Sequence, residues 1–120
     1  MYANESILKG NLTSLHQHLT ANYQNFIIGT VNESCLRLAV FTGTYPWHFH
    51  PDSDELFLVL EGELIIELHD KKSIVLAPNE YVTIPAGVLH RTRSEVRTVN
   101  LCFEHTEANT VFVEESNEVK

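Results

Sequence analysis

The chain has 120 residues, of which 8 are basic and 16 acidic, and its formal net charge is −8. This length allows one domain with one hydrophobic core and excludes two full domains. The sequence has no basic cluster, no apolar run as long as a membrane span and no evident signal peptide. We therefore expect a cytoplasmic protein without a nucleic-acid or membrane partner.

A short amphipathic helix is predicted from about residue 12 to residue 20, because apolar side chains recur there at intervals of three and four. Asn11 precedes the first turn and can cap it. We therefore treat residues 1–24 as an N-terminal helical segment. The apolar positions of this helix are Leu12, Leu15 and Leu19.

The sequence from residue 25 to residue 116 is typical of β-structure, since short apolar and β-branched runs alternate with turn residues. Many short strands at close spacing indicate a sandwich or barrel. Residues 43–46 contain glycine and proline and are expected to break a strand, and residues 117–120 are expected to fray. The predicted strands include residues 26–31, 35–42, 55–60, 64–68, 73–76, 81–84, 88–93, 96–104 and 110–115.

Three histidines and one glutamate on strand-like segments form a candidate metal site. His48 and His50 alternate along a strand, so both rings project from the same face. Glu55 follows after a turn that allows a return to that face, and a folded sheet can bring His90 alongside. Imidazole and carboxylate donors that converge from several strands suit a first-row transition ion. The sequence therefore predicts a metal-binding β-barrel.

The segment around the first two histidines resembles the first motif of the cupin family. That motif is a glycine, His-x-His, a glutamate and a second glycine at fixed spacing. Here Gly43 precedes His48 and His50, and Glu55 and Gly62 follow at the family's spacing. Four residues separate Gly43 from His48, where the family pattern has five.

The segment around the third histidine resembles the second cupin motif, which is a glycine, Pro-x-Gly, a histidine and an asparagine. Pro85, Gly87 and His90 stand at the family's spacing. Asn79 replaces the first glycine, which is tolerable because asparagine enters left-handed conformations readily. Ser94 replaces the terminal asparagine and is not at a ligand position.

The resemblance covers residues 43–94 by motif and nearly the whole chain by strand pattern. It implies an all-β, single-domain cupin double-stranded β-helix, which is a jelly-roll barrel, with a metal near one end of its interior. It also implies one divalent ion, Fe, Mn, Ni, Co or Zn, with up to two coordination positions open to water, substrate or dioxygen. The implied ligands are His48, His50, Glu55 and His90.

Three more side chains are candidates for the wall of a substrate pocket beside the ion. Strand alternation places Phe57 and Val88 on the ligand side, where plain core packing is the alternative role. Tyr45 can hang over the mouth of the barrel. Strand arginines can contact an anionic substrate or can be ordinary exposed residues, and they are Arg37, Arg91 and Arg93.

Some reactive side chains are expected to have no part in the site. Cys35 and Cys102 are expected to be small buried thiols rather than a disulfide. His16 and His18 fit no ligand spacing, and we expect them to be solvated or loosely packed.

Two classes of function remain open. The first is a metal-dependent enzyme that acts on a small polar molecule. It would be either a dioxygenase that uses Fe(II) or a sugar-phosphate-type isomerase that uses a redox-inert ion. The second is a non-enzymatic metal or metabolite binding module, with a sensory or structural role. The apolar run at residues 56–60 favours a homodimer in either class.

Overall fold

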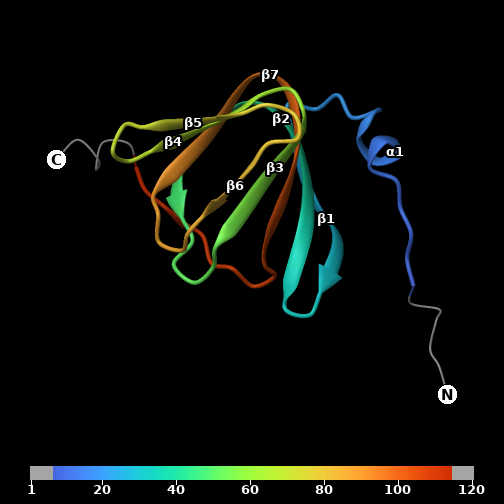
Figure 1. Cartoon of the computed structure of the whole chain (residues 1–120), viewed down its shortest axis with the longest axis horizontal. Helices are drawn as coiled ribbons and strands as arrows, with labels where there is room; N and C mark the ends of the chain where they lie inside the picture. Colours follow the sequence, from blue (N-terminus) through green and yellow to red (C-terminus); the bar gives the residue numbers. More distant parts are fainter. Residues whose placement is uncertain (1–6, 115–120) are drawn as a thin grey trace.

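The computed structural model describes residues 7–114, and within them one short helix and eight strands are found (Figure 1). The predicted frayed end at residues 117–120 lies outside the described residues. No helix within residues 7–114 is long and apolar enough to cross a membrane. The elements are α1 (Leu12–His16), β1 (Tyr23–Val31), β2 (Ser34–Phe49), β3 (Glu55–Glu61), β4 (Leu64–Leu68), β5 (Ser73–Leu76), β6 (Tyr81–Ile84), β7 (His90–His105) and β8 (Val111–Phe112).

Two long strands, β2 and β7, each contribute to both layers of the molecule. In the first layer the N-terminal half of β2 lies between β1 and the C-terminal half of β7, and β3 and β6 follow. In the second layer the C-terminal half of β2 lies between β8 and the N-terminal half of β7, and β4 and β5 follow. The antiparallel layers form the predicted jelly-roll barrel (Figure 1).

The predicted strand break at residues 43–46 is wrong, because β2 runs through it without interruption. The two segments predicted at residues 88–93 and 96–104 are likewise one strand, β7. The pairing of β2 with β7 shifts register between Phe41 and Gly43, and Gly43 has a φ of 119°. A β-bulge bends a strand without ending it. The glycine therefore helps to carry β2 from one layer into the other.

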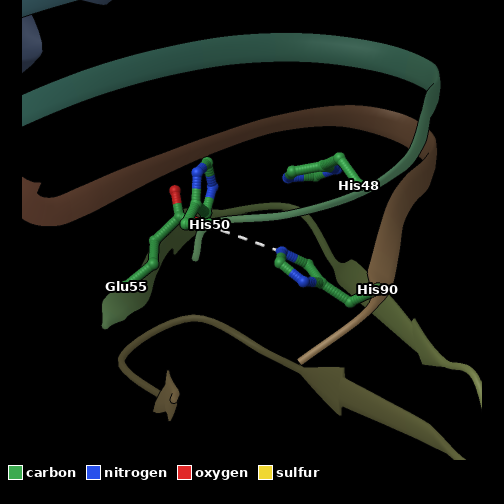
Figure 2. Close-up of side chains that lie close together, drawn as sticks. All are labelled: His48, His50, Glu55 and His90. Carbon is green, nitrogen blue, oxygen red and sulfur yellow. Dashed lines mark hydrogen bonds and ion pairs between the residues drawn. The ribbon is translucent and has the colours of Figure 1, made fainter. Parts of the chain in front are cut away.

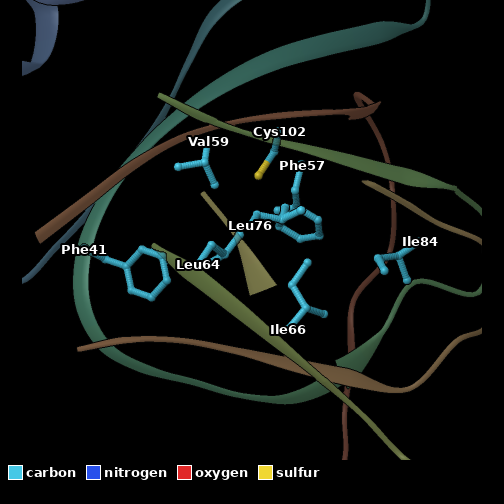
Figure 3. Close-up of a cluster of buried hydrophobic side chains, with 8 residues drawn as sticks. All are labelled: Phe41, Phe57, Val59, Leu64, Ile66, Leu76, Ile84 and Cys102. Carbon is cyan, nitrogen blue, oxygen red and sulfur yellow. The ribbon is translucent and has the colours of Figure 1, made fainter. Parts of the chain in front are cut away.

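The main core lies between the two layers, where alternate side chains of several strands point inward (Figure 3). Burying each large apolar side chain contributes about 1.5–3 kcal/mol. Cys35 and Cys102 are both buried free thiols, as predicted. The core cluster consists of Phe41, Phe57, Val59, Leu64, Ile66, Leu76, Ile84 and Cys102.

A second apolar cluster lies on the opposite face of the first layer. Its buried members alternate with inward-facing residues along β2 and β7, and two residues of β3, Leu58 and Leu60, pack against it. Because Phe57 and Val59 belong to the main core cluster, β3 contributes apolar side chains to both faces of this layer. Leu12 and Leu19 from the N-terminal segment also pack on this cluster. The buried members are Leu38, Val40, Val99 and Leu101.

The helix α1 is capped as predicted but ends earlier than predicted. Asn11 accepts a hydrogen bond from the backbone N–H of Ser14 at 3.0 Å. The helix ends at His16, where the guanidinium of Arg97 donates to the His16 carbonyl at 2.6 Å and to the Leu19 carbonyl at 3.3 Å. These bonds satisfy carbonyls that a longer helix would satisfy itself. Of the two expectations for His16, solvated or loosely packed, the first is wrong, since its side chain is buried.

Two turn positions of the motifs have left-handed backbone. Asn79 has a φ of 72°, so asparagine does adopt the conformation of the glycine it replaces. Gly62, between β3 and β4, has a φ of 84°. A Cβ atom at Gly62 would lie 2.5 Å from the carbonyl oxygen of Arg97 and from Oγ1 of Thr98. Only glycine fits this turn without displacing β7.

Candidate metal centre

The four predicted donors converge inside the barrel, and Figure 2 shows their side chains pointing toward one another. One ligand atom from each of the four lies within 4.8 Å of the other three, and all four residues are buried. The strand pairing explains this convergence. His48 on β2 is the register partner of His90 on β7, and His50 and Glu55 flank the turn between β2 and β3.

Each of the three imidazoles is oriented by a backbone carbonyl. Nδ1 of His48 donates to the carbonyl of Pro46 at 2.8 Å, and Nδ1 of His90 donates to that of Val88 at 2.9 Å. Nδ1 of His50 bonds to the carbonyl of residue 109 at 3.0 Å. A carbonyl oxygen only accepts, so each Nδ1 must carry the hydrogen. In the neutral tautomer this leaves the lone pair on Nε2, which lies in the cluster.

The charges within the cluster are not evenly shared. Burial lowers the pKa of His48 to about 4, so its ring is neutral at neutral pH. Nε2 of His50 lies 3.1 Å from Oε1 of Glu55, and this hydrogen bond raises the pKa of His50 to about 9. Burial is the largest single influence on Glu55 and opposes its ionisation, but the hydrogen bonds and charges of His50 and His90 together outweigh it and lower the pKa of the carboxyl. Without a metal ion, His50 and Glu55 therefore form a buried ion pair.

The cluster fits a transition metal ion. Nε2 of His90 is buried and has no hydrogen-bond partner among residues 7–114, although it lies 3.7 Å from Oε1 of Glu55. A buried polar atom without a partner is costly, and a metal ion would satisfy this one. Three imidazoles and one carboxylate suit Fe, Mn, Ni, Co and Zn alike. The buried donors can therefore hold a metal ion.

A cavity of about 350 Å³ adjoins the cluster. This is the size of a pocket for a small molecule. Its wall is partly aromatic, and Tyr23 and Tyr45 stack there with ring centroids 5.8 Å apart. Its polar lining includes His48, His50, Glu55, Asn25, Arg37, Asn100 and Glu104.

The three predicted pocket residues lie at different distances from this cavity. Tyr45 lines it, with its ring centroid 5.1 Å from that of His48. Phe57 also lines it and lies edge-on to His90, with centroids 6.2 Å apart. Val88 packs against the main core cluster. Their roles toward a substrate stay predictions.

The three strand arginines separate into two groups. Arg37 lines the cavity, where its Nε lies 3.3 Å from Oε1 of Glu104. Arg91 and Arg93 both contact Oε1 of Glu67 on β4, at 2.9 Å and 3.2 Å. Only Arg37 is therefore placed to meet a molecule in the cavity.

Sequence reasoning missed several residues of the cavity, and two of them are polar residues of one strand. Asn100 and Glu104 lie on β7 and share the inward face with Cys102. Alternation from a buried position of this strand could have identified them, because polar residues on an inward face are unusual. Neither belongs to a recognised motif, so this alternation was the one signal that could have pointed to them.

The segment after β7 closes over the cluster. Ala108 and Thr110 line the cavity, and Oγ1 of Thr110 lies 3.2 Å from Nδ1 of His50. The short strand β8 pairs with β2 beside His48. This segment also supplies the Asn109 carbonyl that orients His50. Residues near the C-terminus therefore help to position a donor near the middle of the chain.

Comparison with known proteins adds independent evidence. Residues 37–102 match the family model described as the cupin domain. The chain is 57% identical over 105 residues to a Bacillus subtilis protein named as uncharacterized protein YdbB, an alignment that covers 88% of this chain and 93% of that protein.

Two solved structures are also similar to this chain. The crystal structure of a cupin-2 domain containing protein from Shewanella frigidimarina has a TM-score of 0.75 at 28% identity, over 79% of this chain and 92% of that one. The crystal structure of protein NMB1881 from Neisseria meningitidis has a TM-score of 0.74 at 26% identity, over 82% of this chain and all of that one.

Proposed function

This chain belongs to the cupin-domain family, and on that premise we propose that it binds one divalent transition metal ion and a small polar molecule beside it. The proposed ligands are His48, His50, Glu55 and His90. When bound, the ion supplies Lewis acidity and open coordination positions. The adjoining cavity of about 350 Å³ supplies the space for the molecule.

One observation carries the proposal: all three imidazoles have Nδ1 bonded to a backbone carbonyl. A histidine that only fills space has no need of a fixed tautomer. Metal-ligating histidines commonly donate their second ring N–H to a carbonyl or carboxylate, which fixes the ring and raises its basicity. Three such rings around one carboxylate are best explained as a preorganised ligand set.

The chain's own residues would hold and shape the ligand. The stacked rings of Tyr23 and Tyr45 form an apolar wall, and Phe57 and Phe41 form another part of it. The segment at residues 108–110 covers the donors and excludes bulk water from part of the site. A cavity with apolar walls and few polar groups is typical of a binding site for a small molecule.

The experiment is metal analysis of the chain purified without chelators. We expect close to one transition ion per chain in the wild type and a marked loss in His50→Ala. His18→Ala is the matched control, because it removes an exposed histidine of α1's C-terminal flank. Equal metal content in His50→Ala and the wild type would contradict the proposed site.

The reaction class is tested separately with the loaded protein. Oxygen uptake with Fe(II) in the presence of phenols, thiols or keto acids would support a dioxygenase. Isomerisation of phosphosugars with Zn(II) or Mn(II) would support an isomerase. A molecule that raises the melting temperature without turnover would support the binding module instead.

A further inference from the structure

Glu104 is a largely buried carboxylate that the proposed metal site does not use. It is the register partner of Glu55, so two carboxylates lie directly opposite each other on β7 and β3. Like charges in that arrangement destabilise a sheet unless each has a partner. Glu55 pairs with His50, and Oε1 of Glu104 pairs with Arg37 at 3.3 Å. The second carboxylate is thus held in place by its own arginine.

The other oxygen of Glu104 has no such partner. Oε2 is buried and has no hydrogen-bond donor among the residues that the structure describes, and the whole side chain is only 10% exposed. It lies 4.0 Å from Nε2 of His50, which is beyond hydrogen-bond distance. Glu104 lines the cavity. A molecule bound there can therefore reach an acceptor that the protein itself leaves unsatisfied.

Asn100 presents a second acceptor to the same cavity. Its side chain is 2% exposed, and its Nδ2 donates to Sγ of Cys102 at 3.2 Å. Its Oδ1 is buried and has no hydrogen-bond partner within residues 7–114. Leaving a buried acceptor unpaired is unfavourable. The two atoms together indicate a ligand that donates hydrogen bonds rather than one that accepts them.

We propose that Glu104, held by Arg37, is the acceptor of a ligand subsite in this cavity, and that its ligand is a small neutral molecule that donates a hydroxyl group to Oε2. The inference rests on the proposed function, because it names the class of molecule that the cavity holds. A neutral ligand is favoured because the charged groups that line the cavity are already paired with one another, Glu55 with His50 and Glu104 with Arg37. No charge of these two pairs is left over for a charged ligand.

The aromatic walls determine the probe. Tyr23 and Tyr45 offer flat apolar surface on which a ring can pack. Catechol combines such a ring with two neighbouring hydroxyl groups, so one oxygen can approach the donor cluster while the other donates to Glu104. In 1,2-dimethoxybenzene both hydroxyl groups are capped by methyl groups, so no hydrogen-bond donor is left on the ring. The pair therefore measures what the donated hydrogen bonds contribute to binding.

The test is a titration of both probes into the chain, with and without Zn(II), followed by ¹⁵N–¹H correlation spectra that measure millimolar dissociation constants. We expect the wild type to bind catechol at least about tenfold more tightly than 1,2-dimethoxybenzene, because a hydrogen bond to a charged acceptor is strong. The Glu104 carboxylate accepts without help from the ion, so the preference should persist in the metal-free chain.

The decisive variant is Glu104→Gln. In this variant the amide oxygen of residue 104 accepts from Arg37, so the amide NH₂ group takes the place of Oε2 and faces the ligand. The ligand then meets a hydrogen-bond donor where the wild type has an acceptor. The preference for catechol should fall below about threefold or reverse. Glu63→Gln makes the same change of charge at an exposed position after β3 and should retain the full preference.

Two outcomes would overturn the inference: a full preference for catechol in Glu104→Gln, or a wild type that binds the probes equally or not at all. If Glu104→Gln does not fold, the wild-type spectra still decide. Catechol must shift the backbone amides of Arg37 and Glu104 more than 1,2-dimethoxybenzene does. The proposed metal site is tested separately by measuring the zinc content of the zinc-treated samples, because the titration of the metal-free chain does not depend on metal binding.

Discussion

Asp52 holds Asn109 with both of its carboxylate oxygens. The backbone N–H of Asn109 donates to Oδ1 at 3.0 Å, and its side-chain amide donates to Oδ2 at 2.6 Å. The carbonyl of the same Asn109 accepts from Nδ1 of His50. An exposed aspartate therefore fixes the residue that orients a candidate metal ligand.

Asp52→Ala should weaken metal binding although it removes no ligand. Loss of both hydrogen bonds frees Asn109, and His50 then loses its fixed orientation. Removal of such an outer partner typically costs about 10- to 100-fold in metal affinity. Zinc affinity measured by competition with a chromophoric chelator tests this. Asp70→Ala, in the turn after β4, is the control and should bind zinc as the wild type does. Equal zinc affinity of the two variants would contradict the role of Asp52 in orienting His50 through Asn109.

Binding of a metal ion should stabilise the folded chain. An ion at 100 times its dissociation constant adds about 2.7 kcal/mol, which raises the melting temperature by roughly 10 °C for a domain of this size. Calorimetry with added Zn(II) and with EDTA measures the difference. His90→Ala removes the buried Nε2 donor and should lose most of this response, whereas an undiminished shift would exclude His90 as a ligand.

Metal binding should depend steeply on pH. Because the hydrogen bond with Glu55 raises the pKa of His50 to about 9, the ring is protonated at neutral pH and the ion must displace that proton. Affinity should rise about tenfold per pH unit toward pH 9 and then level off. Calorimetric titration at pH 7.5 in buffers of different ionisation enthalpy should detect about one released proton per ion. Release of no proton would contradict the ion pair.

The raised pKa of His50 also determines how the stability of the metal-free chain depends on pH. A raised histidine pKa contributes stability that is fully present below the unfolded value of about 6.5. This contribution is lost as pH rises through about 9, where His50 deprotonates and Glu55 loses its partner. Urea unfolding of the EDTA-treated chain at pH 7 and pH 10 should therefore give a lower free energy of unfolding at pH 10. His50→Gln should show a smaller difference between the two values.

Gly62→Ala should destabilise the chain strongly. The alanine would adopt a φ of 84° and its Cβ would lie 2.5 Å from the carbonyl oxygen of Arg97. Strain and overpacking of this kind cost about 2–4 kcal/mol together. Gly29→Ala is the matched control, because nothing lies within 4 Å of its Cβ position and its φ is not in the left-handed region. Chemical denaturation of both variants measures the difference, and equal stabilities would contradict this account.

Much of the fold and of the donor set could be predicted because it depends on local geometry. Alternation along a strand places His48 and His50 on one face whatever the rest of the chain does. The capping by Asn11 and the left-handed backbone at Asn79 are also properties of a few neighbouring residues. The homodimer and the cytoplasmic location stay predictions.

The sequence by itself determined most of the strand pattern and the four candidate donors, since these follow from residue type and short-range spacing, and its resemblance to the cupin motifs implied the jelly-roll class. Only the tertiary structure decided that β2 and β7 pass unbroken through their bends, that Asn109 orients His50, and that Glu104 faces Glu55 inside the cavity. The physical reason is that register between distant strands depends on packing across the barrel. No short stretch of sequence contains that information.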